Sequence, residues 1–160
     1  MEPRIELINQ KKLIGHSISM SLTDNKTFDL FTGFMSKRKQ ITNALSDDKF
    51  EVMIYDSLHF KNFNPNKTFI KWATLEVSDF NTIPEGMKDL TIENGLYAIF
   101  KYRGFAKNFG GFMNYVFTEW FPQSEYTLDN RPHFNVLGDK YIKNNPNSEE
   151  DVYIPIKKKA

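Results

Sequence analysis

The chain has 160 residues, no cysteine and a formal net charge of +1 at pH 7. Its length suffices for one ordinary hydrophobic core, and the missing thiols exclude disulfide scaffolds, cysteine-based zinc sites and cysteine nucleophiles. A near-neutral charge argues against binding nucleic acid through a broad basic surface. Aromatic residues form 15% of the sequence, and this excess calls for an explanation beyond core packing.

The N-terminal segment 1–7 mixes charged and apolar residues and shows no hydrophobic stretch typical of a signal peptide. The longest apolar run, Leu96–Phe100, is far shorter than the roughly 20 residues that span a bilayer. We therefore expect a cytoplasmic protein without a membrane segment.

The first half of the chain predicts a strand, a helix and two further strands. Apolar residues alternate over 13–20, as in a strand. A helical stripe of apolar residues begins at Phe28 and is weakened by Gly33 inside it. Strand-like alternation returns over 50–56 and 69–77.

The second half repeats this order after a connecting segment, 81–95, that is rich in turn signals. A strand is predicted over 96–103. The apolar stripe over 109–121 has clean helical spacing. Two strands follow, over 134–137 and 152–156.

Both halves therefore have the order β-α-β-β, which predicts an α+β protein built from a duplicated unit. We expect one domain over residues 1–160, with a first repeat at about 1–82 and a second at about 93–158. Short echoes support this duplication, because Phe50–Asp56 and Phe134–Asp139 both begin Phe, polar, Val, apolar and end in Asp.

Alternation along the strands predicts two unlike sheet faces, one apolar and suited to the helices, with Phe50, Val52, Ala73 and Val152 among its residues. On the opposite face we expect a mixed set of candidate ligand-binding residues: Trp72, Tyr55, Tyr153, Met53, Leu137, Glu51, Glu76, Asn135 and His133. Aromatic walls with a few polar groups are typical of small-molecule pockets, and a carboxylate among them suits a lipophilic cation. Half-exposed sheet residues or a subunit contact are the alternative.

An ordered set of segments resembles the GyrI-like small-molecule-binding domain, the effector module of many AraC-type and MerR-type transcription regulators. The segments are Phe69–Val77, Ile83–Leu90, Gly95–Gly104, Glu119–Tyr126, Arg131–Phe134 and Asp151–Ile156. This resemblance implies two β-α-β-β units related by a pseudo-twofold axis, with helices on one side of antiparallel sheets and a ligand cleft on the other. It also implies hydrophobic, often cationic ligands.

Two departures from the family concern the cleft. Many members have Glu directly after the residue matching Phe134 and Tyr two residues later, whereas this chain has Asn135 and Leu137. An amide can hydrogen-bond a ligand but cannot neutralise a cation, so Glu76 or Glu51 would have to do so. The resemblance places Trp120 near the cleft in relatives, although its helical spacing is that of a core residue.

No cofactor, metal or catalytic residue is predicted. His16, His59 and His133 lack the spacing of a metal site, and Ser124 has no Ser–His–acid context. The two repeats use the whole chain, so we expect no helix-turn-helix and no direct binding of nucleic acid, as in stand-alone members of the family.

Three functions remain open. The first is binding or sequestering a hydrophobic small molecule, cationic or neutral, with a link to transcription regulation. The second is hydrolysis of a lipophilic electrophile, as in some GyrI-like relatives, with Glu76 or Glu51 as acid or base. The third is a protein-binding module resembling the family's gyrase inhibitors. A protein partner and a homodimer stay open as well.

Overall fold

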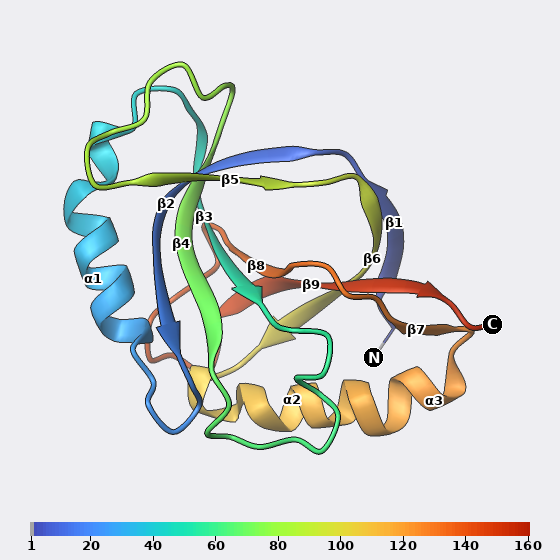
Figure 1. Ribbon diagram of the computed structural model, residues 1–160. Helices are drawn as coiled ribbons and strands as arrows, with labels where there is room; N and C mark the ends of the chain where they lie inside the picture. Colours follow the sequence, from blue (N-terminus) through green and yellow to red (C-terminus); the bar gives the residue numbers. More distant parts are fainter. Residues whose placement is uncertain (1) are drawn as a thin grey trace.

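The computed structural model describes residues 2–160; Met1, where the expected first repeat begins, lies outside the described residues. One curled antiparallel sheet carries the fold, and two helical elements pack against it (Figure 1). The predicted α+β class is confirmed. No helix within residues 2–160 combines the length and apolar character needed to cross a membrane.

Each repeat supplies the predicted strand, helix and strand pair. The first contains β2 (Lys11–Met20), α1 (Thr27–Lys37) with the short turn η1 (Arg38–Gln40), β3 (Ala44–Ile54) and β4 (Phe69–Val77). The second contains β6 (Gly95–Arg103), η2 (Ala106–Asn108), α2 (Phe109–Tyr115), η3 (Val116–Trp120), α3 (Phe121–Gln123), β8 (His133–Leu137) and β9 (Glu149–Lys158).

The helical element of the second repeat runs without a break from α2 through η3 to α3. Its middle part, η3, is π-helical, and the N–H of Phe121 bonds to the carbonyl of Val116. Pro122 has no N–H to donate and its ring crowds the preceding turn, which accounts for the wider turn directly before it.

Three further strands are not predicted from the sequence: β1 (Arg4–Ile8), β5 (Lys88–Ile92) and β7 (Tyr126–Leu128). β5 lies inside the segment 81–95 that was expected to be only a connection. Its five residues are too few for a clear alternation, but Leu90 and Ile92 both pack into the core.

The order of strands is β1-β6-β9-β8-β3-β4-β2-β5, with β7 paired to β9. Its two halves mirror each other, because β6, β9 and β8 of the second repeat stand in the places of β2, β4 and β3 of the first. β3 and β8 pair at the centre and join the two repeats. At the ends the repeats exchange strands: β1, in the first repeat, pairs with β6 of the second, and β5, which directly precedes the second repeat, pairs with β2 of the first. This order matches the predicted duplication.

The sheet has two faces with different surroundings. The helix face is covered by α2, η3 and α3 over β6 and β9, and by α1 over β2 and β4. The inner face lies on the concave side of the curl. A buried cluster fills it with side chains from both repeats: Leu13, Phe50, Val52, Trp72, Ile92, Tyr97, Ile99 and Phe134.

Candidate functional site

The structure distributes nine of the ten predicted site residues over both faces of the sheet and places the tenth, Trp120, in η3. Val52 pairs with Trp72, so Trp72 belongs to the inner face, whereas Glu51 pairs with Ala73 under α1. Six of the ten lie on the helix face or continue it: Glu51, Met53, Tyr55, His133, Asn135 and Leu137. Three lie on the inner face: Trp72, Glu76 and Tyr153.

The inner face around Trp72 is core, which corrects the expectation of a cleft there. Trp72 is only 8% exposed. Tyr153 stacks on Phe134 with ring centroids 4.3 Å apart, and Glu76 pairs with Lys11 at 3.5 Å. The cause is the curl of the sheet, which closes this face on its own side chains.

Trp120 lies apart from the other predicted residues, in η3. Its ring packs edge-on against Phe100, at 5.3 Å between centroids, and stacks parallel to Tyr126 at 6.4 Å. It is therefore part of the hydrophobic cluster that holds the second helical element on the sheet.

Between the areas covered by the two helical elements, the helix face carries polar side chains. Asn135 donates from Nδ2 to Oε1 of Glu51 at 3.2 Å. The other carboxylate oxygen of Glu51 lies 3.5 Å from Nζ of Lys71, which also donates to the Thr27 hydroxyl at 2.9 Å. Lys71 thus neutralises Glu51 and connects this polar part of the sheet to the start of α1.

Asn135 is 2% exposed, and its Oδ1 is buried without a hydrogen-bond partner among the described residues. The orientation of the amide follows from its neighbour, because an ionised Glu51 carboxylate can only accept a hydrogen bond and must face the NH₂ group. A buried carbonyl oxygen without a donor is costly, and it marks a place where a ligand donor would be favourable.

Glu150 completes this floor from β9. Burial, together with the negative charge of Glu51, raises the pKa of the Glu150 carboxyl to about 8, and Lys71 acts in the opposite direction. The sequence alone does not single out Glu150, because this residue ends the polar stretch 144–150, which is typical of a loop. Its spacing from Val152, Ile154 and Ile156 was the available signal. We call Glu51, Lys71, Asn135 and Glu150 the inter-helix floor.

An aromatic wall stands at one end of the floor and consists of Tyr55, His59, Phe60, Phe117 and His133. Tyr55 contacts Phe60 and His133 with centroids 4.9 Å away in each case. Phe60 stacks on Phe117 of η3 at 4.8 Å. Burial lowers the pKa of His133 to about 3 and also lowers that of His59, while it raises the pKa of Tyr55. Both histidines are therefore neutral at pH 7.

A cavity of about 300 Å³ adjoins this wall. Tyr55, Phe60, Phe117 and His133 line one part of it, and residues 127–131 line another. Residues 2–160 provide no group of three or more His, Asp or Glu side chains that could hold a metal ion. The cavity thus offers aromatic surface on one side and polar groups on the other, among them Asp129 and Arg131, which form an ion pair at 2.7 Å.

Two loops reach across from one repeat to the helical element of the other. The β3–β4 loop (55–68) places Phe60 on Phe117. The β8–β9 loop (138–148) places the Lys143 ammonium over the ring of Phe28 in α1, at 4.8 Å. Each crossing thus ties one repeat to the helical element of the other.

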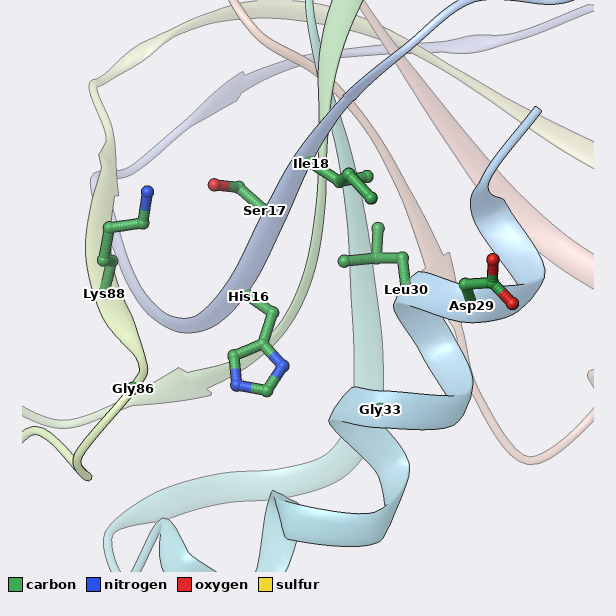
Figure 2. A pocket seen from close by; sticks show the side chains of 8 residues that line it. All are labelled: His16, Ser17, Ile18, Asp29, Leu30, Gly33, Gly86 and Lys88. Carbon is green, nitrogen blue, oxygen red and sulfur yellow. The ribbon is translucent and has the colours of Figure 1, made fainter. Parts of the chain in front are cut away.

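A second hollow of about 280 Å³ lies between β2, α1 and the start of β5. Figure 2 shows the His16 ring between β2 and α1, with the Asp29 carboxylate pointing away from it. Burial lowers the pKa of His16. None of the ten predicted residues lines this hollow, so the aromatic wall and the inter-helix floor form the better candidate site.

Comparison with solved structures supports the same fold. SAV2435 bound to tetraphenylphosphonium has a TM-score of 0.69 and 14% identity, with 98% of this chain and 94% of that chain covered. The EcmrR C-terminal domain has a TM-score of 0.72, 12% identity and coverage of 99% and 98%. An integron cassette protein from the mobile metagenome of Vibrio cholerae has a TM-score of 0.62 and 14% identity, with 98% of this chain and 96% of that chain covered.

No curated protein matched the chain in a sequence search. A family model does match, and it covers residues 4–156, nearly the whole chain. Its description is Cass2, integron-associated effector binding protein. As the resemblance of the sequence segments predicts, the chain belongs to this GyrI-like family of integron-associated effector-binding proteins.

Proposed function

We propose that this protein binds a lipophilic small molecule, preferably a cation, in the cavity beside the aromatic wall and over the inter-helix floor. The observation that carries the proposal is an aromatic-lined cavity of about 300 Å³. Its lining residue His133 lies two residues from Asn135 on the same face of β8, so the cavity and the floor are neighbours along the sheet. Aromatic faces and carboxylates both favour positive charge.

The comparisons support this ligand class. SAV2435, which shares the fold, is bound to tetraphenylphosphonium, a large lipophilic cation. EcmrR, whose C-terminal domain shares the fold, was solved in a complex with DNA. We propose that this chain is likewise a cytoplasmic effector-binding or sequestering module linked to transcription regulation, and we expect binding without turnover of the ligand. The expectations of a protein partner and of a homodimer also remain proposals.

Calorimetric titration with tetraphenylphosphonium tests the proposal. We expect saturable binding to one site per chain, and weaker binding of the neutral analogue triphenylphosphine oxide. Phe60→Ala and Phe117→Leu should each reduce the affinity for tetraphenylphosphonium by about tenfold, since an aromatic contact contributes roughly 1 to 2 kcal/mol.

Phe63→Ala is the matched control, because Phe63 belongs to the same loop as Phe60 but is 54% exposed. Its affinity should equal that of the wild type. Absence of binding, or equal losses in the control and the two wall variants, would refute the proposed site. A chromatographic search for a changed ligand after long incubation checks that binding occurs without turnover.

A further inference from the structure

The ion pairs and hydrogen bonds of the inter-helix floor show which carboxylate is available to a cationic ligand. Glu51 already pairs with Lys71 at 3.5 Å and accepts from Asn135. Within residues 2–160, no hydrogen bond or ion pair engages the Glu150 carboxylate. An additional positive charge on the floor would therefore find its counter-charge at Glu150 and not at Glu51.

The register brings Glu150 close to the unpartnered oxygen of Asn135. Asn135 on β8 pairs with Val152 on β9, and Glu150 is two residues from Val152 on the same face. Such diagonal neighbours on adjacent antiparallel strands have their Cα atoms about 7 Å apart. One ammonium group between two such side chains can reach both oxygens, since each N–H···O bond spans about 2.9 Å.

Other groups also face Glu150, and none of them offers a second free negative charge to a cationic ligand. Tyr102 on β6 pairs with Glu150 on β9, and Tyr141 belongs to the β8–β9 loop. The pKa of each phenol is raised by burial and by the charge of Glu150, so both stay neutral. From β3 and β4, Glu51 and Lys71 face it as a neutralised pair, and Lys49 precedes Glu51 on the same face.

On the basis of the proposed function, we infer that the site selects a protonated lipophilic amine, which donates an N–H to Asn135 Oδ1 and has its charge balanced by Glu150. Asn135 stands where many family members have Glu. With an amide in place of an acid on β8, the counter-charge is Glu150 on the adjacent strand β9, and Asn135 Oδ1 remains as an acceptor for an N–H donor of the ligand. A quaternary cation has the charge but lacks that donor.

Three ligands with one hydrophobic tail separate these contributions: phenylbutylamine, its N,N,N-trimethyl analogue and the neutral alcohol phenylbutanol. We expect wild type to bind the primary amine about tenfold more tightly than the trimethyl analogue, because a charge-assisted hydrogen bond contributes roughly 1.5 kcal/mol or more. The alcohol reports on the apolar wall alone.

Two variants assign the parts. Asn135→Val should bring the two cations to within about twofold of each other, because the acceptor is lost. Glu150→Gln should weaken both cations about tenfold while the alcohol is unaffected. Glu149→Gln is the matched control and should change nothing, since Glu149 lies on the other face and pairs with Lys101 at 3.9 Å.

The outcomes are distinct. Equal affinity of wild type for the two cations, or unchanged cation affinity in Glu150→Gln, overturns the inference and leaves the proposed function standing if the alcohol binds. Failure of all three ligands and of tetraphenylphosphonium overturns both. Thermal denaturation verifies that each variant folds. Should Asn135→Val not fold, the wild-type ratio and the isosteric Glu150→Gln still decide.

Discussion

Glu51 and Asn135 lie directly opposite each other on β3 and β8, the two strands that join the repeats, and they share a hydrogen bond of 3.2 Å. The polar centre of the proposed site is therefore also the centre of the pseudo-symmetric sheet. Each repeat contributes one partner, so the geometry of the floor depends on how the two repeats are joined.

Replacing Glu51 by Gln should destabilise the fold. The change leaves the Lys71 ammonium, whose side chain is 13% exposed, without its counter-charge. We expect a loss of about 2 kcal/mol in the free energy of unfolding, measured with urea. The double variant Glu51→Gln/Lys71→Met should recover most of it; a double variant as unstable as the single one would contradict the assigned ion pair.

Asn135→Glu introduces the acid that the resemblance to the GyrI-like domain leads us to expect at this position. The new carboxylate would face Glu51 directly across the strand pair, where like charges repel. We expect lower stability than wild type at pH 8 and a smaller difference at pH 5, where a carboxyl can take up a proton. Affinity for tetraphenylphosphonium should increase. Calorimetry and chemical denaturation at the two pH values measure both effects.

The pH dependence of stability should contain a contribution from His133. Its pKa is about 3 in the folded protein, against an ordinary value of 6.5, because the ring is buried. The unfolded chain binds the extra proton first, so this stability is present above pH 6.5 and is lost as the pH falls toward 3. The loss approaches about 1.4 kcal/mol per pH unit.

His133→Phe isolates this contribution from that of other titrating groups. The difference in free energy of unfolding between variant and wild type should shift in favour of the variant as the pH falls below 6.5. A difference that is independent of pH between 7 and 4 is the contrary result.

Trp72→Phe distinguishes the two faces of the sheet. Trp72 is buried in the inner-face cluster, so we expect a loss of about 1 to 2 kcal/mol in stability from the smaller ring. Affinity for tetraphenylphosphonium should stay the same, because the proposed site lies on the helix face. A tenfold loss of affinity in this folded variant would return the site to the inner face.

Cation binding should release a proton. At pH 7 the Glu150 carboxyl, with a pKa of about 8, is mostly protonated, and a nearby cation favours its ionised form. Affinity should rise by up to about tenfold per pH unit between pH 6 and 8. The trimethyl analogue is the right probe because its own charge is fixed.

Titrations of this analogue in buffers with different ionisation enthalpies count the protons released. We expect close to one proton per ligand in wild type at pH 7, and none in Glu150→Gln. Proton release of equal size in both proteins would assign it to another group.

The sequence predicted the fold well because its main elements carry strong periodic patterns, such as the apolar stripe of the second helical element. On β4 and β9 it also predicted which residues face the helices: Ala73 and Val152 pack there as expected. The short strands β1 and β5 were missed because five residues show too little alternation.

The site was harder to predict because the alternation within a strand does not say how its phase aligns with that of its neighbour. The alternation alone predicts that Phe50 and Val52 face the helices from β3, since they are its apolar residues. No helix covers the centre of the sheet, however, so the polar side of β3 faces that gap and its apolar side enters the core. Because the alternation of β3 was assigned to the wrong face, Glu51 was expected beside Trp72, whereas the two residues lie on opposite faces of the sheet.

The exchange of end strands has a consequence for how the chain folds during synthesis. Arg4 on β1 pairs with Ile99 on β6, and Lys11 on β2 pairs with Ile92 on β5. Closing loops of this length is entropically costly and slows folding. The first repeat therefore leaves the ribosome with open strand edges, and it can complete its sheet only after β5 and β6 have been made.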